Sequence, residues 1–290
     1  MIIVGCGYVG RAVARYYVER GQSVVGIVRS ADSAAAVEAT GARALQLDLT
    51  RGPLDALARL GLRGERVFHF APPPGDGAED PLTARLVEVF DREGPPQRLV
   101  YIGTTGVYGD CGGAWVDEDR PPRPVAARAR RRWDAEQRLR AWSDASGADL
   151  VILRVAGIYA CDRLPLERIR SGQPVVCADE APWTNRIHAQ DLLAVCIAAM
   201  ERAPAGGLYN VSDGHPSTMT DYFHRVADAA GLPRPEEIPL AEAPGKVSPG
   251  MLSYLAESRR LDNRRMLAEL GVTLRYPELA AGLADCNLGE

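Results

Sequence analysis

The first ten residues contain the pattern that most constrains the fold of this chain. Met1–Val4 is an apolar run with the length of a short buried strand, and it leads directly into Gly5-Cys6-Gly7-Tyr8-Val9-Gly10. In a strand–turn–helix unit, the first glycine allows a tight turn, the second lets a pyrophosphate approach the backbone, and the third lets the helix pack on the strand. The helix N-terminus then faces the phosphate charge. The pattern predicts a dinucleotide site with the members Gly5, Gly7, Tyr8, Val9 and Gly10.

The rest of the first half alternates short apolar runs with helical patterns. Further strands are predicted at Ser23–Val28, Ala42–Leu47, Arg66–Phe70, Gln97–Ile102 and Asp149–Val155. Helices are predicted at Val9–Arg20, Leu82–Glu93 and Ala126–Ser146. A further helix is predicted to begin after a cap at Ser30 or Asp32 and to run towards Thr40. Strands that alternate with helices form parallel βαβ units with helices on both faces of the sheet. The fold class is therefore predicted to be α/β, with a Rossmann-type doubly wound parallel sheet.

The second half is less regular, and proline and glycine are frequent between residues 204 and 250. Helices are predicted at Ala189–Arg202, Thr218–Ala230 and Arg259–Leu270, with a short strand at Leu208–Val211. We expect these segments to form a smaller C-terminal substrate lobe over the carboxyl edge of the sheet. The predicted division is residues 1–155 for the NAD(P)-binding domain and 156–290 for the lobe. It is a soft boundary with interleaved segments, because no flexible linker separates the halves.

The end of the second predicted strand indicates which dinucleotide binds. An NAD site usually has an acidic residue there, about 20 residues after the glycines, to hold the ribose hydroxyls. This chain has Arg29 and Ser30 instead, and an arginine pairs well with a 2′-phosphate. NADP is therefore the predicted cofactor, and NAD remains the alternative if Asp32 reaches the ribose. Asp48, followed by Leu49, is placed to hydrogen-bond the adenine or to cap the next turn.

Composition excludes several classes of function. A net charge of -4 gives no basic field for nucleic acid, and no apolar run approaches the roughly 18 residues of a membrane span. The first residues are expected to be a core strand, not a signal peptide. Six cysteines without a C-x-x-C pair predict reduced thiols in a cytoplasm. The four histidines lack metal-ligand spacing, so no metal site is predicted.

Several segments together resemble the extended short-chain dehydrogenases/reductases of the NAD-dependent epimerase/dehydratase family. They are Gly5–Gly10, His69–Pro73, Tyr101–Gly109, Arg154–Tyr159 and Asn185–Asp191. The pair Asn263–Leu267 and Leu274–Pro277 is similar to the YeeZ-like branch of atypical members. The resemblance extends over nearly the whole chain. It implies a possible homodimer, formed through the helices that follow the fourth and fifth strands.

The resemblance also implies roles for single residues. Ala71 and Pro72 would line the ribose on the nicotinamide side, and Gly157 would lie near the nicotinamide. Thr104 stands where the family has a catalytic Ser or Thr, whose hydroxyl polarises the reacting oxygen; the alternative is a threonine that caps the following loop. The predicted substrate-binding residues are Tyr108, Tyr159, Asn185, Arg186 and His188. Arg186 could pair with a phosphate or carboxylate, or it could be a surface ion-pair partner.

One departure from the family pattern affects the chemistry. The resemblance implies a Tyr-x-x-x-Lys pair early in the long helix, in which the lysine lowers the tyrosine pKa for proton transfer. With Glu136 as the register marker, Arg132 stands at the lysine position and Arg128 at the tyrosine position, and residues 124–140 contain no tyrosine. Lys246 is the only lysine of the chain. Arg132 and Arg128 are therefore the candidates at the catalytic positions, although an arginine cannot replace a phenol that transfers a proton.

Eight arginines lie between residues 120 and 140. Acidic residues are interleaved with them, which favours an ion-paired helix face over a site for an anionic substrate or nucleic acid. Two functions remain in competition. One is an NADP-dependent oxidoreductase or epimerase acting on a nucleotide-sugar-like or carbonyl substrate, possibly anionic. The other is a non-catalytic dinucleotide-binding sensor or partner-binding module.

Overall fold

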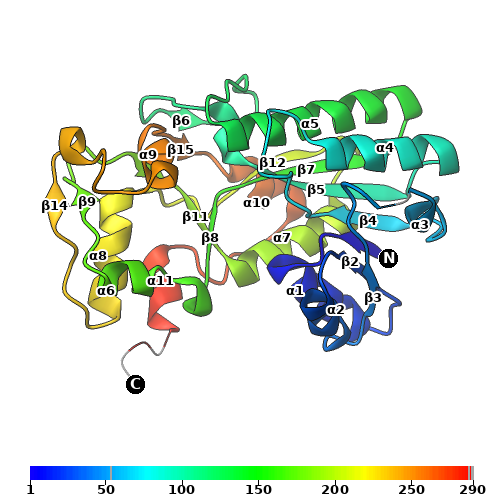
Figure 1. Cartoon of the computed structure of the whole chain (residues 1–290), viewed down its shortest axis with the longest axis horizontal. Helices are drawn as coiled ribbons and strands as arrows, with labels where there is room; N and C mark the ends of the chain where they lie inside the picture. Colours follow the sequence, from blue (N-terminus) through cyan, green and yellow to red (C-terminus); the bar gives the residue numbers. More distant parts are fainter. Residues whose placement is uncertain (53, 287, 289–290) are drawn as a thin grey trace.

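The computed structural model describes residues 1–52, 54–286 and 288, and its centre is a seven-stranded parallel sheet (Figure 1). The spatial order is β12 (Leu208–Val211), β7 (Leu150–Val155), β5 (Arg98–Thr104), β4 (Arg66–His69), β1 (Ile2–Val4), β2 (Val25–Val28) and β3 (Arg43–Gln46). Every neighbouring pair in this sheet is parallel. The predicted Rossmann-type doubly wound α/β fold is confirmed. The strand order reverses between β1 and β4, the kind of place where such sheets bind ligands.

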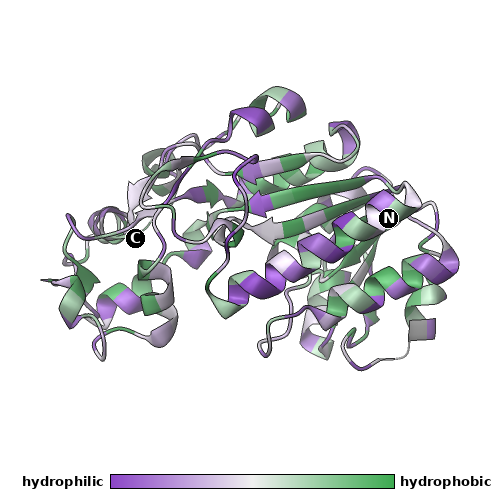
Figure 2. Ribbon diagram, turned by 90° about the horizontal axis from the view of Figure 1, so that it is seen from above, coloured by the Kyte–Doolittle hydropathy of each residue, from purple (hydrophilic) through white to green (hydrophobic). Residues whose placement is uncertain are grey.

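Helices cover both faces of the sheet. One face carries α4 (Pro81–Glu93) and α5 (Ala127–Ser146), together with the short α3 (Leu54–Ala58). The other carries α1 (Tyr8–Val18), α2 (Ala31–Glu38), α7 (Ala189–Arg202) and α10 (Arg264–Leu270). In Figure 2 the sheet strands are largely coloured as hydrophobic, while the helices over them alternate in colour. This pattern follows from burial, because a sheet covered on both faces has apolar strands and one-sided helices.

Local chemistry explains where the first elements begin. Ser30 caps α2, since its Oγ accepts a hydrogen bond from the Ser33 backbone nitrogen at 3.3 Å. Gly5 has a positive φ of 83°, and a Cβ at this position would lie 2.3 Å from the backbone nitrogen of Ala71. The turn after β1 can therefore contain only a glycine at residue 5.

The second lobe lies beside the carboxyl edge of the sheet (Figure 1). Its helices are α6 (Leu166–Arg170), α8 (Met219–Ala229), α9 (Pro249–Leu255) and α11 (Leu279–Ala284). Short strand pairs connect it: β8 (Gly157–Tyr159) with β11 (Arg186–His188), β9 (Val175–Val176) with β14 (Glu237–Ile238), β10 (Trp183–Thr184) with β13 (Ser217–Thr218), and β6 (Trp115–Val116) with β15 (Arg260–Leu261). Short 3-10 turns lie at Thr105–Tyr108, Cys161–Arg163 and Leu240–Glu242. The prediction of one helix over Arg259–Leu270 was wrong at its start, because Arg260–Leu261 pairs with β6 instead.

The chain crosses between the two parts more than once. Strand β12 returns from the second half of the sequence and pairs along β7. Helix α7 packs against α1, and α10 packs against both α7 and β12. The division of the sequence at residue 155 stays a prediction. In space, the sheet and its helices include segments from both halves.

A disulfide joins Cys161, in the turn after β8, to Cys286 at the end of α11. The expectation that all six cysteines are reduced thiols was wrong for this pair. The two residues are 125 positions apart, so their spacing gave no indication of the bond. The cytoplasmic location stays a prediction. Within residues 1–52, 54–286 and 288, no helix combines the length and apolar character needed to cross a membrane.

Candidate functional site

A cleft of about 730 Å³ opens at the switch point between β1 and β4. The predicted cofactor residues that line it are Gly5, Gly7, Tyr8, Val9, Gly10, Arg29, Ser30, Asp48, Leu49, Ala71 and Pro72. Gly157, predicted in the same group, lies in a neighbouring cleft instead. We refer to the 730 Å³ space as the first cleft. The glycine turn and the ends of β2, β3 and β4 therefore converge on one cavity.

The glycine turn fits a pyrophosphate. A Cβ on Gly7 would meet nothing closer than the Gly5 carbonyl oxygen at 4.0 Å, so the backbone is open towards the cleft. Helix α1 begins at Tyr8, and no side chain among the described residues caps it. Its first backbone N–H groups remain available to an anion. The residues present therefore match the phosphates of a dinucleotide.

The far end of the first cleft contains Arg29, Ser30 and Asp48. Arg29 is exposed at the end of β2. Asp48 Oδ1 accepts hydrogen bonds from the backbone nitrogen and the hydroxyl of Thr50, at 2.9 and 2.6 Å. These bonds hold the pKa of Asp48 below its usual value. Asp48 thus caps a turn, which is one of the two roles considered for it, and it also lines the cleft; the hydrogen bond to adenine stays a prediction.

A second cleft of about 380 Å³ lies next to the first. The two clefts share Ile102, Arg132 and Ile158 in their walls. The second cleft is lined by the predicted site residues Thr104, Arg128, Arg132, Gly157, Asn185 and Arg186. The fold therefore brings together residues from β5, α5, β8 and β11 that are far apart in the sequence.

Thr104 ends β5 and caps the 3-10 turn that follows. Its Oγ accepts a hydrogen bond from the Gly106 backbone nitrogen at 3.1 Å. This contact uses one lone pair of the hydroxyl and leaves its proton free to be donated. Thr104 is consistent with the capping alternative and retains a donor for a reacting oxygen.

Arg132 lies on α5 where the two clefts meet. Its Nη1 donates to the carbonyl oxygen of Ile102 at 3.1 Å and more weakly to that of Ala71 at 3.5 Å. Within the described part of the chain it makes no ion pair with a carboxylate inside 4 Å. The guanidinium is thus anchored to the ends of β4 and β5 and contributes a positive charge to the shared wall.

Arg128 faces α9 from the second cleft. Its guanidinium carbon lies 3.8 Å from the centre of the Tyr254 ring, it donates to Ser253, and Glu257 is 3.7 Å away. Tyr254, Glu257 and Arg259 all line the second cleft. Sequence reasoning missed these three residues. Ser248 and Pro249 are a recognisable helix start, but nothing in the sequence places that helix over this cleft.

The structure does not bring Tyr108, Tyr159 or His188 to either cleft. Tyr108 is buried and donates to Asn210 at 2.7 Å. His188 is buried and caps α7 by accepting from the Gln190 backbone nitrogen at 3.2 Å. Tyr159 is buried in the second lobe's core. Their positions point to structural roles.

Asn185 lines the second cleft, but its amide is already occupied. Its Nδ2 donates to the Arg259 carbonyl oxygen at 3.0 Å, and its Oδ1 accepts from the Leu261 backbone nitrogen at 2.8 Å. The side chain therefore fastens β15 to the wall of the cleft, and its contribution to a substrate site is to position that segment.

Among the described residues, three of the six arginines on α5 form ion pairs with carboxylates, and one of these is Arg128, which pairs with Glu257 as described above. Arg138 contacts Asp134 at 2.8 Å, and Arg140 contacts Glu136 at 3.0 Å. The Glu136 carboxylate is fully buried and also pairs with Arg154. The ion-paired helix face favoured by the sequence is therefore present over part of α5.

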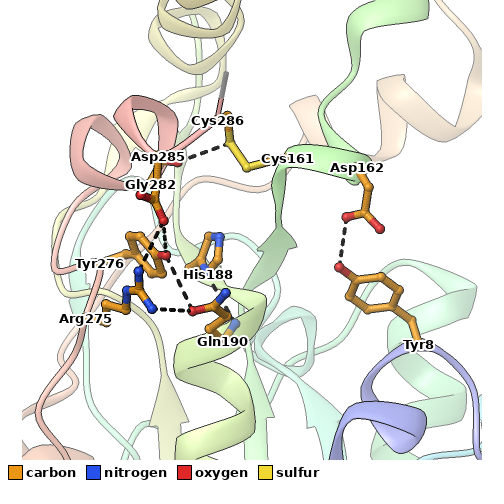
Figure 3. The surroundings of a disulfide bond; sticks show 10 residues. All are labelled: Tyr8, Cys161, Asp162, His188, Gln190, Arg275, Tyr276, Gly282, Asp285 and Cys286. Atoms are coloured by element: carbon orange, nitrogen blue, oxygen red, sulfur yellow. Dashed lines mark hydrogen bonds and ion pairs between the residues drawn. A yellow bond between two sulfur atoms is a disulfide. The ribbon is translucent and has the colours of Figure 1, made fainter. Parts of the chain in front are cut away.

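A contact joins the second lobe to Tyr8 of the glycine turn, which lines the first cleft (Figure 3). The Tyr8 hydroxyl donates to Asp162 at 2.8 Å, and the Arg163 guanidinium carbon is 4.7 Å from the Tyr8 ring centre. Both residues belong to the turn that begins at disulfide-bonded Cys161. The disulfide therefore anchors a segment that touches the predicted cofactor site.

Residues 1–212 match the model of the NAD dependent epimerase/dehydratase family. The chain belongs to this family. Among its relatives is a 4-hydroxy-2-methyl-3-oxo-4-farnesyl-3,4-dihydroquinoline-1-oxide ketoreductase of Stigmatella aurantiaca, 28% identical over 246 residues, which cover 79% of this chain and 72% of the relative.

Two solved structures extend the comparison. A functionally unknown conserved protein from Silicibacter pomeroyi is 32% identical with a TM-score of 0.82, and the match covers 97% of this chain and 95% of that one. A UDP-glucuronic acid 4-epimerase from Bacillus cereus in complex with NAD is 16% identical with a TM-score of 0.77, covering 98% and 94%. The second likeness concerns the fold alone. This member of the epimerase/dehydratase family thus shares its architecture with an enzyme whose structure contains NAD.

Proposed function

We propose that this chain is an NADP(H)-dependent oxidoreductase or epimerase acting on a carbonyl or hydroxyl carbon of a small molecule. The observation that carries the proposal is the meeting of the two clefts at Ile102, Arg132 and Ile158. A dinucleotide in the first cleft and a substrate in the second would be in contact across this shared wall. When bound, the nicotinamide would exchange a hydride with the substrate carbon.

Different residues of the first cleft would bind different parts of the dinucleotide. The open backbone at Gly7 and the uncapped start of α1 would hold the pyrophosphate. Arg29 would pair with a 2′-phosphate, which supports NADP over NAD. Ala71 and Pro72 would line the ribose beside the nicotinamide.

The proposed chemistry operates without the Tyr-x-x-x-Lys pair. The Thr104 hydroxyl would donate a hydrogen bond to the reacting oxygen, and the Arg132 charge would stabilise negative charge that develops there. Neither is an effective proton source. Of the described residues that line the second cleft, only Tyr254 is a tyrosine. We propose that its phenol gives up or takes the proton, in place of a tyrosine on α5.

Turnover by purified protein tests this function. We expect micromolar or tighter NADPH binding by calorimetry and absorbance changes at the nicotinamide band with a panel of ketones and nucleotide sugars. Thr104→Val is expected to lower kcat about 100-fold, the usual loss for one donor to a reacting oxygen. Thr104→Ser keeps the hydroxyl and is expected to stay near the original rate. Absence of binding by either dinucleotide would refute the proposal.

One observation favours the alternative of a non-catalytic sensor. Arg128 stands where the family resemblance implies a tyrosine, and Ser253, Tyr254 and Glu257 engage its side chain. A sensor would bind NADPH tightly without turnover on the panel, and Thr104→Val would leave its partner or conformational response unchanged. If the parent protein turns over a substrate and either Thr104→Val or Tyr254→Phe lowers that turnover, this alternative is excluded.

A further inference from the structure

The second cleft has an excess of positive charge in its wall. Among the described residues it is lined by Arg128, Arg132, Arg186 and Arg259, together with a single acidic residue, Glu257. Four guanidinium groups against one carboxylate leave three positive charges. In a cleft of this size, low-dielectric walls strengthen their combined field.

Glu257 is already shared between two of these arginines. Its Oε2 lies 3.1 Å from Arg259 and 3.7 Å from Arg128. Arg259 also donates to the Gly109 carbonyl oxygen at 2.8 Å. The carboxylate is buried, with its side chain 5% exposed. Glu257 therefore balances the α9 side of the cleft and leaves the β8–β11 side without a counter-charge.

Arg186 lies on that side and has few partners. Its Nη1 donates to the Asn185 carbonyl oxygen at 3.0 Å, which occupies one of five N–H groups. Its guanidinium carbon is 4.0 Å from the ring centre of Tyr222. Among the described residues no carboxylate lies within 4 Å of it. Arg186 is half-buried, and a guanidinium that is partly withdrawn from water without a counter-ion favours an anionic ligand.

Asp213 neutralises the charge of Arg186 only in part. The charges of Asp213 and Arg186 interact, but the two side chains do not form an ion pair. Burial raises the pKa of Asp213 to about 7, so this carboxyl is partly protonated at neutral pH. Burial also lowers the pKa of Arg186, yet an arginine stays charged in proteins. The positive charge is thus available to a ligand.

The absence of a side chain at Gly157 leaves room for the Arg186 guanidinium in the wall of the cleft. A Cβ on Gly157, in the parallel neighbour strand β8, would lie 3.1 Å from Arg186 Nη1. Gly157 and Arg186 both line the second cleft. The predicted contact of Gly157 with the cofactor stays a prediction, and in the structure this glycine makes space for Arg186.

We infer that the second cleft selects a compact anionic substrate and that Arg186 binds its carboxylate or phosphate group. The planar guanidinium forms two parallel hydrogen bonds with either group. A volume of about 380 Å³ is near the small end of ligand sites, roughly 300–1,000 Å³. The inference rests on the proposed function, since it names the substrate class of that same site. The phosphates of the dinucleotide belong to the first cleft, at the glycine turn.

Calorimetry on the NADPH-loaded protein in a phosphate-free buffer tests the inference. Malonate and inorganic phosphate are the probes, and malonamide is the uncharged match for malonate. We expect saturable binding of malonate, of phosphate or of both, and none of malonamide. The stronger of the two anions identifies the substrate's charged group. The inference would be overturned if malonamide saturates the protein at the same concentration. It would also be overturned if neither malonate nor phosphate shows saturable binding.

Variants assign the binding to one residue. Arg186→Gln is expected to weaken the anion at least tenfold, because a charge-assisted pair is lost. Arg186→Lys keeps the positive charge but lacks the planar guanidinium, so its anion affinity should lie between those of the parent and Arg186→Gln. Arg234→Gln is the matched control: Arg234 is exposed and pairs with Asp228 away from the cleft. Unchanged anion affinity in Arg186→Gln would overturn the assignment.

Two readouts separate this inference from the proposed function. NADPH affinity and the unfolding temperature of Arg186→Gln are expected to match those of the parent. If NADPH does not bind, the proposed function fails, and the same anion titration on the unliganded protein still decides whether Arg186 holds an anion. If NADPH binds but no anion does, the function stands and the substrate class is wrong.

Discussion

The two clefts are formed by different kinds of structural feature. The first lies at the ends of neighbouring strands and depends on a glycine turn that has no room for a Cβ at Gly5. The second is formed by side chains from β5, α5, β8, β11 and the α9 region, four of them arginines. A backbone site follows from the fold and is shared by proteins of the same architecture. A side-chain site depends instead on which residues the individual sequence places there.

The largest expected effect comes from the glycine turn. Gly5→Ala would place a Cβ 2.3 Å from the Ala71 backbone nitrogen, at a residue with a φ of 83°. We expect a loss of about 3 kcal/mol or more in the free energy of unfolding, measured by urea denaturation. Gly7→Ala has room for its methyl group, so it should stay folded and lose NADPH binding. Equal stability of the two variants would contradict the backbone account of the first cleft.

The disulfide should have the next largest effect. Cys161→Ser opens a link between residues 125 apart, which is expected to lower the free energy of unfolding by about 2–4 kcal/mol. Dithiothreitol should produce the same loss in the parent protein and no further loss in the variant. Cys177→Ser, at a free cysteine of the same lobe, is the control. If Cys161→Ser and Cys177→Ser unfold alike, the bond is not part of the native protein.

The two clefts should also differ in their response to pH. His69 ends β4 beside the first cleft, and burial lowers its pKa to about 3. Because its unfolded pKa is near 6.5, the unfolded chain takes up the proton first, and stability is lost as pH falls below that value. For Asp213, near the second cleft, burial raises the pKa to about 7. The folded chain takes up that proton first, so stability is lost as pH rises from about 4 through 7.

Each contribution amounts to about 2 kcal/mol between pH 7 and pH 5, and the two have opposite signs. Urea denaturation at both pH values measures them. Relative to the parent, Asp213→Asn should lose stability on acidification, and His69→Gln should gain it. A shift of the same sign in both variants would show that these two groups do not set the pH dependence.

The smallest effect concerns the choice of cofactor. Arg29→Ala should reduce NADPH affinity about tenfold, equivalent to about 1.4 kcal/mol, and leave NADH affinity unchanged. Titration of both dinucleotides measures the ratio. If the parent already binds NADPH and NADH equally, and the variant does the same, Arg29 does not recognise a 2′-phosphate.

The same contrast explains what could be predicted from the sequence. The glycine turn, Arg29 and Asp48 follow strand ends, and a parallel sheet brings strand ends to one edge, so the first cleft was predicted from local pattern. Tyr254, on the short helix α9, and Arg259 reach the second cleft from a segment about 100 residues beyond β7. Contacts of this kind depend on how the lobe folds over the sheet, which no periodicity in the sequence indicates.

His188 and Tyr159 show what a family motif does not indicate. Both lie in segments that resemble the family, and both were predicted to bind substrate, yet they pack against each other with ring centres 5.1 Å apart. His188 also packs on Tyr276 at 3.9 Å. A family motif identifies a segment reliably, but the direction of each side chain depends on neighbours such as Tyr276, which comes from the far end of the chain.

The return of β12 to the sheet has a consequence for work with fragments. A polypeptide ending at residue 155 would contain the glycine turn and its first six sheet strands, but Leu150–Val155 would become an edge strand. This strand is fully buried in the intact chain. An apolar edge with unpaired backbone groups recruits strands from other molecules. The dinucleotide half should therefore aggregate when it is expressed alone, and it should become soluble when residues 186–275 are supplied as a second polypeptide.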